Sequence, residues 1–390
     1  MAWIKTRVTD DGDKRFVGCY RDPEGRTRSA GTYSSKRAAE RAANREEAKV
    51  REGNWHDHSR GQVTFTDYVQ TVWLPSKQVE TSTLAAYRSY LDKHFIPVFG
   101  RRPMGNILPS EIQRWVTTAT DDGLSAASVR KYHTMLHSIF ERALTDRVIT
   151  FNPCETTELP KVIKKTSRTL TPAEYDTILN ALPTQHRLMI ETAINTGLRW
   201  GELIALKPRH LNLTTGHLTV EETIVEVSIK NSPTGTRMLT KPYPKDNEPR
   251  TMALPEQLVT QLAAWIADRA LGPSDLLFAT RDGTPISRNT FRTRIWRPAV
   301  NASGLNFDVR VHDLRHAHAS WLLSGGSDIR SVMDRMGHAQ ITTTQKYLHT
   351  LPDADHKNLT ALQRIRNTAP GPRPDPPGED TDRNHRDREA

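Results

Sequence analysis

The chain has 390 residues, 26% of them charged, and carries a formal net charge of +10 at pH 7. This length allows two or three domains, and the positive charge favours a polyanionic partner, with nucleic acid ahead of an anionic membrane surface. No apolar run is long enough to span a membrane, the first residues lack the apolar stretch of a signal peptide, and two isolated cysteines, Cys19 and Cys154, provide neither a disulfide framework nor a zinc cluster. We therefore expect a cytoplasmic protein with no membrane association.

Residues 1–60 predict a small basic α+β module. Three strand-forming stretches, WIKTRVT, RFVGCYRD and RTRSAGTY, are separated by the turn formers DDGD and DPEG. The stretch SSKRAAERAANREEAKVREG then predicts a helix that starts at a Ser cap and ends at Gly53. A three-stranded sheet of this size could lie in a DNA groove, although an ordinary small domain with solvated charges fits the same pattern.

Residues 61–165 predict an all-α domain. Several amphipathic stretches, among them TSTLAAYRSYLDKHFIPVFG and SAASVRKYHTMLHSIFERALTDRVI, begin at a Ser or Thr cap. Basic and aromatic residues interleave along them, which suits phosphate contacts beside an apolar face but is also normal for amphipathic helices. The candidate DNA contacts in this domain are Arg88, Lys93, Arg130 and Lys131.

Three prolines and a basic cluster mark a domain boundary near residues 160–168. Beyond the boundary, residues 166–355 predict a mixed, mainly α region with helices at 172–195 and strands in HLTVEETIVEV and RTMALP. Residues 356–390 form a C-terminal segment that ends in a tail rich in proline and charge, and we expect this tail to be disordered.

The stretch VHDLRHAHASWLL, residues 311–323, combines three histidines and an arginine with apolar residues at three- and four-residue steps. This spacing predicts a helix with one buried face. His312, Arg315 and His316 share a face of that helix because residues three and four apart are neighbours there, whereas His318 points elsewhere. Taken singly, each of these histidines is more often a surface or satisfied core residue than a functional group.

Further fragments extend this pattern: NTGLRWGELIAL around Arg199, YPKDNEPRTMALP around Lys245, and MGHAQITTTQKYLH with His338 and Tyr347. Their order and spacing are specific, since His338 follows Arg315 by 23 residues and Tyr347 follows His338 by nine. With this set the sequence resembles the tyrosine recombinases, the integrases of phages and mobile elements that break and rejoin DNA. The segments KPYPK and RTMALP are similar to segments of integrases from actinobacterial phages or integrative plasmids.

The resemblance implies a multidomain fold: an arm-type DNA-binding module at 1–60, a helical, SAM-like core-binding domain at 61–165 and a catalytic domain at 166–355. It implies a site-specific recombinase that cuts and rejoins double-stranded DNA through a 3′-phosphotyrosyl intermediate and a Holliday junction, and that integrates a phage or mobile element without a metal, ATP or other cofactor. The implied partners are core-type and arm-type attachment sites, a homo-tetramer on DNA, an excisionase and a host DNA-bending protein.

The resemblance also implies catalytic roles. Tyr347 corresponds to the nucleophile, and Arg199 and Arg315 correspond to the cations that stabilise the pentavalent phosphorus. The chemistry fits, because a phenol with a pKa of about 10 needs activation and forked guanidinium donors match two non-bridging oxygens. Replacing either arginine by lysine should therefore not be conservative.

Three further roles complete the implied site. Lys245 resembles the general acid that protonates the departing 5′ oxygen, and it is preferred over Lys241, on the same hairpin, because it precedes Arg250 by five residues. His312 resembles the residue that handles the tyrosine proton. His338 resembles a second phosphate-contacting group that supports the nucleophile.

Neighbouring residues receive weaker assignments. Glu202 follows Arg199 by three residues and is expected to orient it or to pack at a helix start. His316 is expected to be structural, and His318 is given no role. Gly337 is expected to end the helix SDIRSVMDRM in a left-handed cap and so to turn His338 into the cleft.

Two other functions fit parts of the pattern. A metal-dependent nuclease would use the histidines as ligands, although the sequence has no HExxH motif and no acidic cluster for a hard cation. The ligands in this nuclease would be His312, His316, His318 and His338.

The second alternative is a DNA-binding regulator that kept the fold without catalysis. The intact set of motif residues argues against it.

Overall fold

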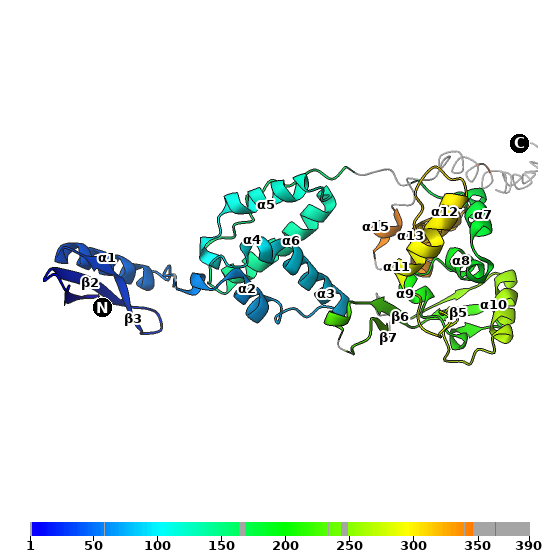
Figure 1. The fold of residues 1–390 in the computed structure, drawn as a ribbon, viewed down its shortest axis with the longest axis horizontal. Coiled ribbons are helices and arrows are strands. Elements are labelled where there is room, and N and C mark those ends of the chain that lie inside the picture. The colour runs from blue at the N-terminus through cyan, green and yellow to red at the C-terminus, as the bar shows by residue number, and fades with distance from the viewer. Residues whose placement is uncertain are drawn as a thin grey trace, which may run out of the picture. The chain divides into compact units, whose positions relative to one another are not determined.

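The computed structural model describes most of the chain, namely residues 2–57, 59–163, 168–232, 234–242, 249–338, 340–345 and 363. The chain divides into two compact units, Met1–Lys165 with Val227–Arg237, and Thr166–Glu226 with Met238–Ala390 (Figure 1). Among the described residues, no helix has both the length and the apolar character needed to cross a bilayer.

The first unit opens with an antiparallel sheet of order β1-β2-β3, whose strands are Trp3–Val8, Lys14–Arg21 and Thr27–Tyr33. Helix α1, Lys36–Arg51, is capped by the Ser35 hydroxyl and lies across one face of this sheet (Figure 1). The helix stops two residues before Gly53, where the backbone turns left-handed at φ 74°. Helix and sheet approach so closely that a Cβ atom at Gly18 would lie 2.4 Å from Ala39 O, so only glycine fits there.

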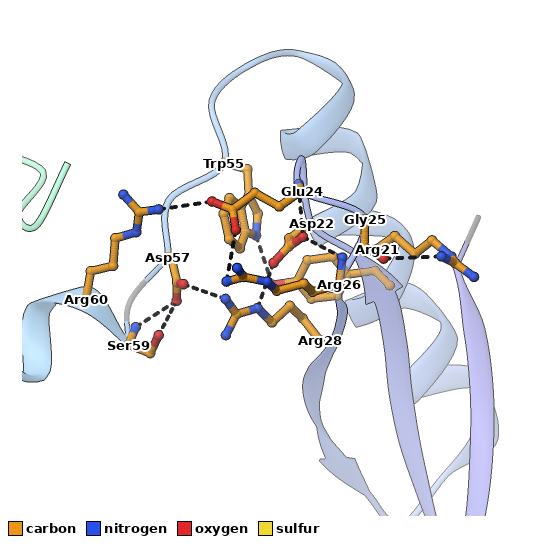
Figure 2. Close-up of polar contacts among 11 residues, drawn as sticks. Arg21, Asp22, Glu24, Gly25, Arg26, Arg28, Trp55, Asp57, Ser59 and Arg60 are labelled. Atoms are coloured by element: carbon orange, nitrogen blue, oxygen red, sulfur yellow. Dashed lines mark hydrogen bonds and ion pairs between the residues drawn. The ribbon is translucent and has the colours of Figure 1, made fainter. Parts of the chain in front are cut away.

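The segment that follows α1 is held against the β2–β3 turn by polar contacts (Figure 2). The buried Asp22 carboxylate accepts a hydrogen bond from Arg28 Nε at 2.9 Å, and Arg28 Nη2 donates to Asp57 Oδ2 at 2.6 Å. Trp55 Nε1 donates to the Tyr20 hydroxyl at 2.9 Å. Two separate groups of hydrogen bonds therefore tie the exit segment to the module.

The rest of the first unit is helical, as the amphipathic pattern predicts. Its core is rich in aromatic side chains, among which Phe65, Trp73, Phe95 and Phe140 are fully buried. Its helical elements are η1 Arg60–Gln62, α2 Phe65–Tyr68, η2 Val69–Trp73, α3 Thr81–Tyr90, η3 Leu91–Phe95, α4 Ile96–Phe99, η4 Met104–Asn106, α5 Pro109–Asp121 and α6 Ala126–Thr145.

The second unit combines helices with two small antiparallel sheets, of order β4-β5-β8 and β6-β7. Its strands are β4 Leu211–Asn212, β5 His217–Val220, β6 Thr223–Glu226, β7 Met238–Lys241 and β8 Arg250–Ala253. Its helical elements are α7 Pro172–Ala181, α8 Thr184–Thr196, α9 Trp200–Leu203, η5 Pro208–His210, η6 Ile229–Asn231, α10 Glu256–Asp268, α11 Arg288–Phe291, η7 Arg292–Trp296, α12 Arg297–Ala302, α13 Val311–Ser324, α14 Ile329–Met336 and α15 Ile341–Gln345.

The predicted fold class is confirmed: a small α+β module, an all-α domain and a mixed, mainly α domain follow one another along the chain. The helix predicted at 311–323 is α13, and it packs against α8 in the core of the second unit. The C-terminal segment 356–390, with its predicted disordered tail, lies outside the described residues apart from Gln363.

Candidate active site

Two glycine-capped helix C-termini meet beside α13. Helix α8 ends at Gly197 and helix α14 ends at Gly337, and both glycines have left-handed backbone, with φ of 64° and 62°. The predicted left-handed cap at Gly337 is therefore confirmed. Gly197 is also fixed by space, because a Cβ atom there would lie 2.6 Å from Cδ2 of His318. Main-chain carbonyls at a helix C-terminus have no partner within the helix, so these two caps offer acceptors to nearby side chains.

The guanidinium of Arg315 is held by the carbonyls of both caps. Arg315 lies on α13 and is only 3% exposed. Its Nη1 donates to Gly197 O at 2.5 Å and its Nη2 donates to Met336 O. Carbonyls at helix C-termini carry partial negative charge, so they orient the guanidinium without neutralising it as a carboxylate would.

Arg199 binds the carbonyl next to the one that holds Arg315. Arg199 precedes α9 as its N-cap, and its Nη2 donates to Gly337 O at 2.7 Å. Because Met336 O and Gly337 O belong to consecutive residues, the two guanidinium groups are brought to the same place. Two permanent cations with forked donors form an arrangement suited to a phosphate group.

The buried carboxylate of Glu202 joins Arg199 to a third arginine. Glu202 is 1% exposed and accepts hydrogen bonds from Arg199 Nη1 at 3.0 Å and from the Arg199 main-chain N–H at 2.9 Å. Arg250, at the start of β8, donates to both oxygens of the same carboxylate, at 3.3 and 2.6 Å. Burial opposes ionisation, but hydrogen bonds and charge from Arg250, then Arg199, hold the pKa of Glu202 below its usual value.

Burial and nearby positive charge keep the imidazole of His312 neutral. Burial, followed by the neighbouring charges of His316 and Arg315, lowers the pKa of His312 to about 4. The His312 and His316 rings lie edge to face, with centroids 4.8 Å apart. The imidazole of His312 is therefore neutral at pH 7, which is the protonation state of a general base.

His338 directly follows the Gly337 cap and is buried. Its Nδ1 lies 2.9 Å from the hydroxyl of Thr344, in the short helix α15 that precedes the Tyr347 segment. This contact fixes the ring orientation and connects His338 to the segment that would carry the nucleophile.

Two of the motif residues lie outside the described part of the chain. They are Lys245 and Tyr347. Lys241, the other candidate for the general acid, ends β7 opposite Thr223, and burial lowers the pKa of its ammonium group. The preference for Lys245 over Lys241 stays a prediction.

The structure gives His318 a structural position that the sequence did not suggest. Its Nδ1 lies 2.7 Å from Ile194 O, and its Nε2 accepts a hydrogen bond from Arg335 Nε at 3.2 Å. Arg335 Nη2 donates to Asn195 O at 3.0 Å and to Ala253 O at 3.1 Å, and so joins α14 to α8 and β8. With both ring nitrogens engaged, His318 is not available to a metal ion.

The metal-dependent alternative gains no support from the described residues. Across the described ranges, no group of three or more histidine, cysteine, aspartate or glutamate side chains is arranged to hold a metal ion.

A row of exposed arginines on α11, η7 and α12 was missed from the sequence. After burial, His316 and Arg315, the positive charge of Arg288 also contributes to the lowered pKa of His312, so this first member of the row lies near the candidate site. In the sequence this row is a run of four arginines within ten residues, a pattern that ordinary amphipathic helices also show. The row comprises Arg288, Arg292, Arg294 and Arg297.

The four candidate DNA contacts of the helical domain are all exposed, and two of them also serve the fold. Arg130 Nε donates to Pro160 O at 2.8 Å and so holds the segment that leaves this domain. Lys131 Nζ donates to the Tyr90 hydroxyl at 2.9 Å. Arg88 and Lys93 lie on α3 and η3, with their side chains toward solvent.

The face of the β1–β3 sheet that α1 leaves open is basic. Gly18 faces α1, and its cross-strand partner is Ile4, so the alternate residues point to the opposite face. On that face Arg7 lies directly opposite Arg15, with Lys5 next along the strand, and all three are exposed. Like charges directly opposite each other destabilise a sheet, which favours a polyanion as the partner of this face.

Comparisons with known proteins relate the chain to phage integrases. The family model described as "Phage integrase family" matches residues 168–353, and the model described as "Phage integrase, N-terminal SAM-like domain" matches residues 64–118. The chain is 26% identical over 370 residues to the prophage phiRv2 integrase of Mycobacterium tuberculosis, covering 92% of this chain and 95% of that protein.

A second relative and a solved structure are also similar to this chain. The chain is 30% identical over 247 residues to the tyrosine recombinase XerD of Listeria monocytogenes, covering 62% of this chain and 77% of that protein. Its fold is similar to that of lambda integrase, solved as a tetramer bound to a Holliday junction, with a TM-score of 0.57, 24% identity, and coverage of 88% of this chain and 94% of that one.

Proposed function

The chain belongs to the phage integrase family of tyrosine recombinases, and from this premise we propose how its residues cut and rejoin DNA. The observation that carries the proposal is the pair of guanidinium groups, Arg199 and Arg315, held by the adjacent carbonyls of Gly337 and Met336. A phosphodiester placed between these cations has its non-bridging oxygens bound and its phosphorus made electrophilic.

The reaction follows from these groups. The Tyr347 oxygen attacks phosphorus, its proton passes to the neutral imidazole of His312, and the P–O bond to the 5′ oxygen breaks. Lys245 donates a proton to the departing oxygen, which leaves a 3′-phosphotyrosyl link and a free 5′-hydroxyl. A 5′-hydroxyl from a second duplex reverses the step, and two rounds of exchange pass through a Holliday junction.

Because the covalent link retains the bond energy, the reaction proposed here needs neither a metal ion nor ATP. The purified protein should recombine a supercoiled plasmid that carries its two attachment sites, in EDTA and without a nucleotide. Agarose electrophoresis of the recombinant circles measures this. A strict need for Mg²⁺ or a nucleotide would overturn the proposed chemistry.

We assign the DNA partners by domain. Residues 166–355 and the helical domain 61–165 act on the core site, with Arg88, Lys93, Arg130 and Lys131 as backbone contacts, and the module 1–60 binds the arm site. The proposed assembly on DNA is a homo-tetramer, as in the lambda integrase structure on a Holliday junction. An excisionase and a host DNA-bending protein would set the direction, and the protein would act in the cytoplasm on nucleoid DNA.

We predict that replacing Arg7 and Arg15 together by alanine weakens arm-site binding by about tenfold or more. The slope of log affinity against log salt concentration should become shallower by the amount expected for about two lost phosphate contacts. The reason is that both guanidinium groups lie on the open sheet face and would each contact a phosphate. Fluorescence anisotropy with arm-site DNA over a salt series measures both effects.

Arg26 provides the matched control for this experiment. It is a basic residue of the same module that lies in the β2–β3 turn, outside the strands of the open face, and Glu24 pairs with it at 2.9 Å, closer than the 4.0 Å between Arg15 and Asp13. Arg26→Ala should therefore change arm-site binding little. An equal loss from Arg26→Ala, or an unchanged salt slope for the double variant, would rule out the open face as the arm-site contact.

The regulator alternative shares the DNA binding but not the chemistry. It predicts that a Tyr347→Phe variant retains the biological effect of the protein, whereas the recombinase loses it. The two guanidinium groups of Arg199 and Arg315, held side by side at the C-terminus of α14, favour the recombinase.

A further inference from the structure

Arg250 makes the same two connections as Arg199, although it is not one of the motif residues assigned to the site. Both arginines bind the Glu202 carboxylate, and both reach the C-terminus of α14. Arg199 Nη2 donates to Gly337 O at 2.7 Å, and Arg250 Nε donates to Arg335 O at 3.2 Å. With a side chain only 11% exposed, Arg250 occupies the interior of the site.

The Glu202 carboxylate is fully used by the two arginines. Each of its oxygens accepts one hydrogen bond from Arg199 and one from Arg250, which together fill the acceptor positions of a carboxylate. A carboxylate paired with one guanidinium would largely cancel its charge. Shared between two, it leaves net positive charge, so Arg199 remains able to attract a phosphate.

Arg250 also supports the cap that precedes His338. A Cβ atom at Gly337 would lie 3.0 Å from Arg250 Nη1 and 3.2 Å from its Cδ, so the guanidinium packs directly against the glycine backbone. Arg250 begins β8 and pairs with Val220 of β5, which fixes the start of its side chain. One arginine therefore connects the strand that follows Lys245, the acid beside Arg199 and the turn before His338.

From this geometry we propose that Arg250 is a positioning residue of the strand-cleavage reaction. It holds Glu202 in place so that Arg199 keeps both its orientation and its charge for the scissile phosphate. The inference rests on the proposed function and deepens it, because it adds a residue that acts through Arg199 without touching DNA.

The test measures the rate of the covalent protein–DNA product on a nicked core-site duplex at saturating protein. Arg250→Lys keeps the positive charge but replaces the guanidinium by an ammonium group. The ammonium cannot reproduce both the paired contact with the two Glu202 oxygens and the hydrogen bond to Arg335 O. We expect its cleavage rate to fall by about tenfold to thirtyfold, while core-site affinity stays within about threefold, because only the transition-state interaction is lost.

Arg330→Lys is the matched control. Arg330 lies on α14 and pairs with Asp334 at the surface, with its side chain 73% exposed. This variant should cleave at the wild-type rate. Thermal melting checks that Arg250→Lys remains folded, and a folded Arg250→Lys variant that cleaves like wild type would overturn the proposal.

A double-mutant cycle with Arg199→Lys separates positioning from a merely structural role. If Arg250 acts through Arg199, the double variant should be barely slower than Arg199→Lys alone. The defect of Arg250→Lys should also shrink on a core site with a neutral methylphosphonate at the scissile position, since an uncharged phosphorus centre needs less cationic stabilisation. The proposal would be overturned if the rate losses of the two single variants multiply in the double variant. It would also be overturned if Arg250→Lys is as slow, relative to wild type, on the methylphosphonate as on the natural phosphate.

The wild-type protein distinguishes this inference from the function on which it rests. If wild type forms the covalent product but the rate losses of Arg250→Lys and Arg199→Lys multiply in the double variant, only the role proposed for Arg250 is rejected. No covalent product from wild type, despite binding, would reject the proposed chemistry and the inference with it.

Discussion

Replacing Tyr347 by phenylalanine is expected to abolish the covalent protein–DNA product, a loss of at least about 10⁴-fold, because no other group is assigned to attack phosphorus. Phenylalanine keeps the ring and removes only the attacking oxygen. Binding to the core site should therefore be unchanged. The measurement is a denaturing gel of wild type and variant incubated in EDTA with a labelled, nicked duplex that carries the attachment core.

Tyr175→Phe is the matched control. Tyr175 is buried on α7 in the same unit, and within the described part of the chain its hydroxyl has no hydrogen-bond partner. Removing that oxygen should leave the covalent band intact. A Tyr347→Phe variant that still forms the band would show that another group is the nucleophile. If wild type itself forms no band, the DNA-binding regulator becomes the favoured function.

Local pattern predicted the parts of the site that lie on single elements. The three- and four-residue spacing of 311–323 identified helix α13, and the glycine after SDIRSVMDRM identified the left-handed cap at Gly337. Both follow from interactions within one turn of the chain. For the same reason, the three strands and the helix of the first module follow from their turn formers and caps.

The contacts that assemble the site were not predictable from such patterns. Arg199 binds a carbonyl 138 residues away, and Arg250 binds a carboxylate 48 residues away. No periodicity encodes contacts between elements at that separation. Arg335 and His318 illustrate the same limit, because each resembles ordinary helix charge in the sequence and yet forms hydrogen bonds with two other segments.

Replacing Arg315 by lysine is expected to lower the cleavage rate by about 10³-fold although it preserves the positive charge. The guanidinium uses two nitrogens to satisfy Gly197 O and Met336 O and thereby presents its remaining edge in a fixed direction. An ammonium group cannot donate to two carbonyls and a phosphate with the same planar geometry. We also expect a lower melting temperature, because buried carbonyls that lose a charged donor cost about 1–3 kcal/mol.

Arg310→Lys distinguishes this geometry from charge alone. Arg310 lies five residues earlier, is 63% exposed and forms a surface pair with Asp313 at 2.9 Å, so its replacement should change cleavage and melting little. Single-turnover cleavage and thermal melting of both variants provide the comparison. Since Arg315→Lys keeps the charge, any rate difference from Arg310→Lys measures the orientation imposed by the two helix caps. Cleavage by Arg315→Lys within about threefold of wild type would mean that the site needs only positive charge there, and that the carbonyls of Gly197 and Met336 serve folding instead of catalysis.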